Sequence, residues 1–255
     1  MKKIFLGFFV FCCLANNSFA SPNRNLTVFA EQNMVASLVK ISRLYSQKNH
    51  VIVSVNFNSS AELISEVDSG EPADIFISAH TGWIESLRQK GLTDVYNTGH
   101  IARDKLVVVA SKNNLNIPAI LCDKILSVEE VLKILNQQKA VLLSDPEGSS
   151  SGKFSTDLLK SMDLSDLQIF TKLSEDKSTA LDLSGDNLES YAILLASQIK
   201  HKPNLKVLAS QKEANILYQA LVIAGDNMDT AREFLKFLKS EPAKNIFREN
   251  GFVVD

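Results

Sequence analysis

The segment that most constrains the fold runs from Gly70 to Ala79 and reads GEPADIFISA. Gly70 and Pro72 predict a turn, and the short apolar run from Ile75 to Ile77 predicts a buried strand. Segments with helical spacing lie on both sides, and a buried strand between two helices is typical of a parallel sheet. In such sheets the carboxyl ends of the strands open onto the ligand crevice. The small polar residues after Ile77 therefore mark a candidate binding edge.

The first 20 residues have the composition of a signal peptide. Lys2 and Lys3 supply positive charge, an apolar stretch follows from Ile4 to Leu14, and Ala20 ends a small-residue cleavage motif. The apolar stretch, about eleven residues, is too short for a membrane span, which needs about twenty. We expect cleavage after Ala20 and a mature protein that is exported across the inner membrane to the periplasm.

Charge and motifs exclude several classes of function. The chain has 255 residues and a formal net charge of −2, which becomes −4 when Lys2 and Lys3 are removed. It has no basic stripe, so we expect no nucleic-acid partner. The histidines lack the spacing of metal ligands, and no phosphate-binding loop or hydrolase motif is present. We therefore expect no catalytic residues, no cofactor and no metal, although a hydrolase or transferase that uses a cleft stays as an alternative.

Strand-like and helix-like segments alternate along the chain, which predicts an α/β fold built from doubly wound sheets. Two lobes or one continuous domain are both compatible with this pattern. We expect strands at 26–30, 51–57, 75–78, 106–110, 140–143, 167–172, 191–195 and 220–224. We expect helical faces within 34–45, 63–67, 83–91, 128–135, 154–159 and 228–247.

Several segments, in order, resemble periplasmic molybdate-binding proteins, the solute-receptor subunits of ABC importers. They are 56–63, 70–79, 106–110, 144–147 and 237–252. The resemblance implies a two-lobed periplasmic-binding-protein fold, in which each lobe is a doubly wound mixed sheet flanked by helices and two strands cross between lobes. We expect lobe 1 to comprise 21–103 and 222–255, and lobe 2 to comprise 104–221. It also implies a monomer that delivers a small oxyanion to a membrane permease.

In that family the oxyanion lies between the lobes, held by N–H groups and hydroxyls at helix N-termini. The resemblance places the ligand contacts at Asn33, Ser60, Ser151, Lys177 and Leu195. Ser60 keeps the family's serine, and Ser151 lies where a backbone N–H points at the anion. Asn33 replaces a serine, Lys177 replaces a small apolar residue, and Leu195 replaces a tyrosine. These departures alter the set of donors.

Glu31 lies near the first binding loop, where the family has a small residue. A carboxylate there would repel an oxyanion by roughly 1 to 4 kcal/mol at about 4 Å. Lys177 would neutralise it, or the two would bracket a zwitterion; alternatively, Glu31 points to solvent. His80 is the one histidine that we expect near the cleft.

The function that these observations favour is an exported receptor for molybdate or tungstate. The alternatives are the same fold with another anion or a zwitterion as ligand, and a receptor that signals without transport.

Overall fold

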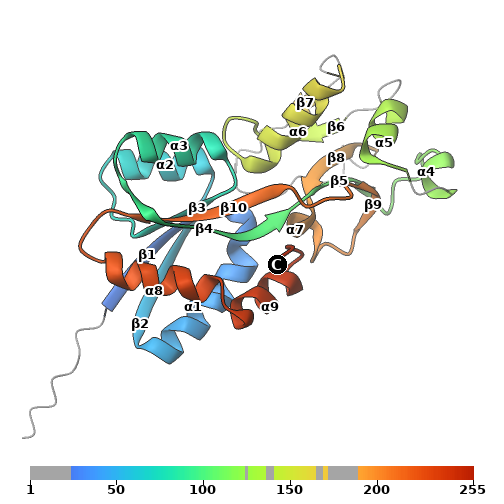
Figure 1. Cartoon of the computed structure of the whole chain (residues 1–255). Coiled ribbons are helices and arrows are strands. Elements are labelled where there is room, and N and C mark those ends of the chain that lie inside the picture. The colour runs from blue at the N-terminus through green and yellow to red at the C-terminus, as the bar shows by residue number, and fades with distance from the viewer. Residues whose placement is uncertain (1–23, 124–125, 136–140, 165–168, 172–188) are drawn as a thin grey trace, which may run out of the picture.

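The structure is a computed structural model, and it describes residues 24–255 except 124–125, 136–140, 165–168 and 172–188 (Figure 1). Within these residues the chain forms two five-stranded sheets, each flanked by helices, in the orders β2-β1-β3-β10-β4 and β7-β6-β8-β5-β9. The first sheet contains β1 (Arg24–Glu31), β2 (Val51–Asn58), β3 (Ile75–Ser78), β4 (Thr93–Asp104) and β10 (Ile216–Ile223). The second contains β5 (Leu106–Ser111), β6 (Val141–Leu143), β7 (Ile169–Thr171), β8 (Tyr191–Leu195) and β9 (Leu205–Ser210).

Both sheets are mixed, as the resemblance implies. In the first, β1 runs parallel to β2 and β3, whereas β10 runs antiparallel to β3 and β4. In the second, β6 runs parallel to β7 and β8, whereas β5 runs antiparallel to β8 and β9. The parallel neighbours β1 and β2 are joined by α1, and β6 and β7 by α6, because a parallel connection must cross back over the sheet.

Helices cover both faces of the first sheet (Figure 1). On one face lie α2 (Ser60–Asp68) and α3 (Thr81–Gln89); on the other lie α1 (Val35–Asn49), α8 (Met228–Leu238) and α9 (Glu241–Glu249). Neighbouring residues of β1 point to opposite faces of the sheet, since side chains alternate along a strand. Phe29 packs with Leu63 and Leu87 of α2 and α3, whereas Val28 and Ala30 join the cluster that contains α1 and α8.

The second sheet is flanked by α4 (Ile120–Asp123), α5 (Val128–Leu135), α6 (Ser150–Ser161) and α7 (Ala196–Ile199). Along β5, Val107 and Val109 pack with Leu194 on one face. Val108 belongs to the largest apolar cluster, which includes core residues of both sheets. The two lobes therefore share a continuous apolar core on one side.

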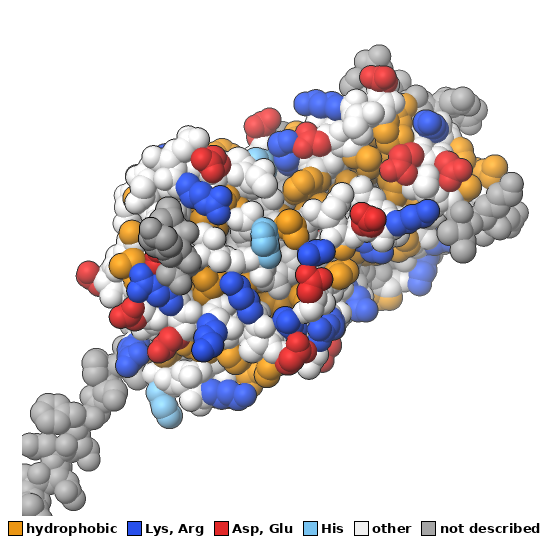
Figure 2. Space-filling model, in the orientation of Figure 1, with side chains coloured by type: hydrophobic (Ala, Val, Ile, Leu, Met, Phe, Trp, Pro, Cys, Tyr) orange, Lys and Arg blue, Asp and Glu red, His pale blue; other side chains and the backbone are white. Residues whose placement is uncertain are grey.

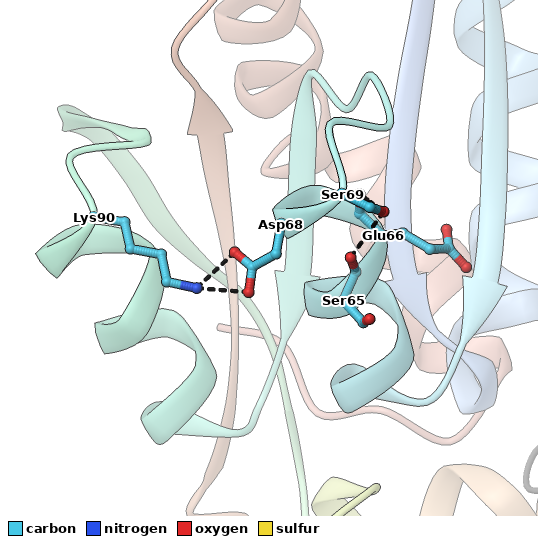
Figure 3. A network of polar contacts seen from close by, with 5 residues as sticks. All are labelled: Ser65, Glu66, Asp68, Ser69 and Lys90. Atoms are coloured by element: carbon cyan, nitrogen blue, oxygen red, sulfur yellow. Dashed lines mark hydrogen bonds and ion pairs between the residues drawn. The ribbon is translucent and has the colours of Figure 1, made fainter.

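A small network of polar contacts lies at the end of α2 and joins it to the end of α3 (Figure 3). Lys90 Nζ contacts both carboxylate oxygens of Asp68, at 2.6 and 2.7 Å, and the Ser69 hydroxyl donates to the carbonyls of Ser65 and Glu66. The Lys90 and Asp68 side chains are 41% and 43% exposed, so their pairing contributes no more than about 1 kcal/mol. On the face shown in Figure 2, Lys and Arg side chains are interspersed with Asp and Glu side chains. The apolar core, rather than surface charge, holds these elements together.

The predicted elements correspond closely to the observed ones, although the short helices at Ile120–Asp123 and Ala196–Ile199 were not predicted. The long strand β4 and the edge strand β9 were not predicted. The C-terminal helical segment is two helices, because α8 ends at Leu238 and Pro242 lies in the first turn of α9. The chain passes between the sheets at Lys105, and β10 lies wholly in the first sheet. The chain is therefore back in the first sheet from Ile216, whereas we expected lobe 1 to resume at residue 222.

Candidate functional site

Three polar side chains meet where the parallel strands of the first sheet end. β1 ends at Glu31, β3 ends at Ser78, and α2 begins at Ser60, two residues after β2 ends. The pairing of Glu31 with Asn58 and of Ala30 with Ile77 aligns these strand ends. Because parallel strands present their carboxyl ends at one edge of a sheet, the three side chains converge there.

The Glu31 carboxylate is the centre of this cluster. Its Oε1 accepts hydrogen bonds from the Ser60 hydroxyl at 2.8 Å, the Ala79 backbone N–H at 3.0 Å and the Ser150 hydroxyl at 2.6 Å. The Ser78 hydroxyl also donates to it. Glu31 is 6% exposed, and Ser60, Ser78 and Ser150 are fully buried. One anionic oxygen is thus surrounded by neutral donors, away from solvent.

These donors come from both lobes. Ser60 opens α2 in the first lobe, and Ser150 opens α6 in the second. Each helix has a capping serine just before it: Ser59 accepts from the N–H of Glu62 at 3.3 Å, and Ser149 accepts from that of Gly152 at 3.0 Å. The positive ends of two helices therefore face the carboxylate, which favours negative charge there.

Gly152 lets the loop before α6 approach the first turn of the helix closely. A Cβ atom at this position would lie 2.2 Å from the Asp145 carbonyl oxygen and 2.5 Å from that of Ser144. Both are backbone atoms, so a side chain would displace the loop that leads to Ser150. The position of Ser150 thus depends on a residue without a side chain.

A second polar group extends from the cluster toward the crossing between the lobes. The Asn33 amide, in the short 3-10 helix η1 (Gln32–Met34), donates to the Tyr218 hydroxyl at 2.6 Å and to the Ser197 hydroxyl at 3.0 Å. Burial raises the pKa of Tyr218 well above its usual value, and the negative charges of Glu31 and Asp104 raise it further. The Tyr218 phenol is therefore protonated at neutral pH, and since it accepts from Asn33 its own proton is still a donor.

Asp104 is buried at the end of β4, directly before the crossing residue Lys105. Burial raises its pKa to about 6, although hydrogen bonds from Ser197 and from the Lys105 N–H act in the opposite direction. The Lys105 N–H donates to Asp104 Oδ1 at 2.8 Å. Since Ser197 also accepts from Asn33, this carboxyl group is connected to the site through one serine.

His80 lies beside the cluster, as expected. Its backbone N–H donates to the Ser78 hydroxyl at 2.8 Å, and its ring stands 5.5 Å from that of Trp83. Burial lowers the pKa of His80, and the charge of Glu31 partly opposes that change. The imidazole therefore tends to be neutral beside the buried carboxylate.

The structure brings together two of the five residues predicted as ligand contacts. Ser60 is part of the Glu31 cluster, and Asn33 is joined to Tyr218 next to it. Ser151 is buried in the first turn of α6, adjacent to Ser150, and its hydroxyl has no partner among the described residues. It is Ser150, one residue earlier, that donates to Glu31.

The other two predicted contacts contribute no polar side chain here. Lys177 lies outside the described residues. Leu195 ends β8 with a buried apolar side chain, and its backbone N–H donates to Gln198 Oε1 at 2.9 Å. The alternative that Glu31 points to solvent is wrong, because its carboxylate is buried among the donors described above.

Sequence reasoning missed Ser150, Tyr218 and Asp104 as members of this region, and it marked Ser78 only as part of a candidate binding edge. The position of Ser78 at the end of a buried run was a usable sign, since such positions face the crevice. Ser150 lies one residue before the expected contact, Ser151. Tyr218 lies within an apolar strand and gives no comparable sign.

The described residues bear on two further features, a metal site and a membrane-spanning helix. Among them, no group of three or more His, Cys, Asp or Glu side chains is placed to hold a metal ion. No helix in this part of the chain is long and apolar enough to cross a bilayer.

Two α/β lobes with buried hydroxyl and N–H donors between them are the architecture of a solute-binding protein. Residues 26–253 match the family model of bacterial extracellular solute-binding proteins, and the chain belongs to this family. The predicted resemblance is thereby confirmed, and the two mixed sheets confirm the predicted fold class.

Similar proteins of known identity cover nearly the whole chain. The molybdate-binding protein ModA of Escherichia coli (strain K12) is 27% identical over 257 residues, which span 99% of this chain and 97% of that protein. ModA of Haemophilus influenzae is 28% identical over 244 residues, 92% of each chain. The structure of the periplasmic molybdate-binding protein of Azotobacter vinelandii aligns with a TM-score of 0.67 at 19% identity, covering 90% of this chain and 99% of that one. That structural likeness shows the shared fold.

Proposed function

We propose that this protein is the exported receptor of an ABC importer and binds a small oxyanion, molybdate or tungstate, between its lobes. The observation that carries the proposal is the convergence of neutral donors from both lobes on one anionic oxygen, Glu31 Oε1. The names of its relatives from Escherichia coli and Haemophilus influenzae support molybdate as the solute.

Neutral donors suit a fully deprotonated oxyanion. Such an ion has acceptor atoms only, so every hydroxyl and N–H can donate to it, whereas a protonated anion would present a proton to a donor. Helix N-termini add positive potential without a metal or a cationic side chain. We assign Ser60, Ser78, Ser150 and the Ala79 N–H as the donors to the anion.

Further contacts are proposed from the family resemblance. These are the amide of Asn33, the backbone at Ser151, and the positions of Lys177 and Leu195. The Tyr218 hydroxyl, held by Asn33 at 2.6 Å, would supply from β10 a phenol that the family carries at the position of Leu195.

Closure of two lobes on a shared ligand is the expected mode of action. We propose that residues up to about 104 and from about 216 form the first lobe, with the second lobe between them, because the sheets divide there. Contacts from both lobes favour the closed state, which a membrane permease would then recognise. Export would follow removal of residues 1–20 after Ala20, and the receptor would act as a monomer.

Thermal unfolding of the mature protein, from Ser21 onward, tests the ligand. We expect molybdate and tungstate to raise the melting temperature, since a ligand at about 100 times its dissociation constant stabilises the folded state by about 2.7 kcal/mol. Sulfate, phosphate and a set of amino acids serve as comparisons at the same concentration and ionic strength. Stabilisation by an amino acid, without any by molybdate or tungstate, would refute the proposed solute.

A further inference from the structure

Glu31 occupies the place that the proposed function gives to the solute. Its Oε1 receives three hydroxyls and one backbone N–H, and it lies 6% exposed among them. All four of these donors are neutral. A buried carboxylate in such surroundings has the contacts of a bound anion, although it belongs to the chain itself.

The donors cannot serve Glu31 and a free anion at once. A serine hydroxyl has a single proton, and those of Ser60, Ser78 and Ser150 are all directed to the same carboxylate oxygen. The Ala79 N–H is likewise used. An incoming oxyanion gains these bonds only after the Glu31 side chain has left them.

We propose that Glu31 is a tethered anion that fills the solute's oxygen position, so that a free oxyanion binds only by displacing it. This inference rests on the proposed function, because it takes the same donors to be those of the solute. Glu31 then determines specificity: an ion binds only if it gains more from these donors than the attached carboxylate does. Weakly accepting anions are excluded by competition within the chain.

The same contact joins the two lobes without a solute. Glu31 comes from β1 in the first lobe, and Ser150 opens α6 in the second. A solute closes a receptor of this kind by contacting both lobes, and Glu31 makes such a contact by itself. We therefore expect the closed arrangement to be populated before the solute binds.

Two substitutions separate the charge of Glu31 from its volume. Glu31→Ala removes both and leaves the donors unpaired, whereas Glu31→Gln removes the charge and keeps an acceptor oxygen of similar size. Glu71→Ala is the matched control, since Glu71 is exposed on the turn before β3 and its loss changes net charge equally. Circular dichroism and melting temperature first establish that each variant is folded.

Calorimetric titration with sodium molybdate gives the main result. We expect Glu31→Ala to bind molybdate at least tenfold more tightly than the wild type, Glu31→Gln to show a smaller gain, and Glu71→Ala to show none. Equal or weaker binding by Glu31→Ala would overturn the proposal. If Glu31→Ala does not fold, the comparison rests on Glu31→Gln, and an affinity equal to that of the wild type would overturn it.

Formate provides a test that does not depend on molybdate. This small carboxylate should raise the melting temperature of Glu31→Ala, by restoring an anion to the free donors, and leave that of the wild type unchanged. The same concentration of chloride controls for ionic strength. An equal response of both proteins to formate would overturn the tethered-anion proposal. If no variant binds molybdate or tungstate while formate rescues Glu31→Ala, the proposed solute fails and the role of Glu31 stands.

Discussion

Replacing Asp104 with Asn should make the protein harder to unfold at neutral pH, and the gain should disappear in acid. Asp104 is fully buried at the end of β4, where the chain leaves the first sheet. Its pKa is raised to about 6 because burial disfavours the charged form, and the N–H groups of Lys105 and Ser197 offset this only in part. Keeping this carboxylate ionised in the folded protein therefore costs free energy.

The sign and the size of the effect follow from linkage. The raised pKa means that the folded chain binds the proton more tightly than the unfolded chain, where the ordinary value of 3.8 applies. Stability is thus highest below pH 3.8, falls as the pH rises toward 6, and levels off above it. The difference between the two pKa values corresponds to about 3 kcal/mol. About 2 kcal/mol of this should fall between pH 4 and 7.5, because the titration has already begun at pH 4.

Urea unfolding at several pH values over that range measures the effect. Other carboxyl groups also titrate, so the informative quantity is the difference in unfolding free energy between Asp104→Asn and the wild type. As the pH rises over this range, Asp104→Asn should gain about 2 kcal/mol of unfolding free energy relative to the wild type. Asp226→Asn, on the exposed turn after β10, is the matched control and should show no such shift. Parallel pH profiles for Asp104→Asn and the wild type would refute the reasoning.

Three further substitutions test the elements that position the site. Gly152→Ala should destabilise the protein by about 1 to 3 kcal/mol and weaken molybdate binding, because its Cβ would meet backbone atoms of the preceding loop. Gly225→Ala is the control: its Cβ would have open space, so melting and titration assays should show neither effect. Ser149→Ala removes the cap of α6 and should cost about 1 kcal/mol in urea unfolding, with no loss contradicting the capping role. Phe234→Ala should cost about 3 to 5 kcal/mol, since this ring is fully buried in α8 and packs edge-on at 4.9 Å from Tyr45; a loss below 1 kcal/mol would mean that the core refills the space.

Local patterns predicted most of the fold because they record which side chains are buried. The spacing of Met34, Leu38, Ile41 and Tyr45 indicated a helical face, and all four side chains are buried against the first sheet. The helical face expected within 83–91 ends at Gly91, which has a left-handed φ of 68° typical of a helix C-terminus. β4 was missed because its sequence, TDVYNTGHIARD, contains too many polar residues to give a clear alternation.

The site was harder to predict because it is made by contacts between distant segments. The Glu31 carboxylate accepts hydrogen bonds from Ser60, Ser78 and Ser150, which lie 29, 47 and 119 positions further along the chain. Asn33 and its partner Tyr218 are 185 positions apart. The sequence indicates where strands end and helices begin, but it was the family resemblance that indicated Ser60. It does not indicate which serine hydroxyl at the start of α6 reaches Glu31, and in the structure this is the hydroxyl of Ser150.

Glu31 shows why charge alone is a poor guide to such a site. From the sequence, a carboxylate beside an anion pocket predicts repulsion, and this would hold if both negative groups occupied the pocket together. In the structure the carboxylate lies on the donors themselves, where the hydroxyls and two helix N-termini stabilise it as they would stabilise a solute. The relevant free energy is then the difference between two anions competing for one set of donors. In the wild-type background, Ser150→Ala removes a donor from the solute and from its competitor Glu31 alike, so the two losses partly cancel. In the Glu31→Ala background only the solute loses that donor, and Ser150→Ala should therefore reduce molybdate affinity more there than in the wild type.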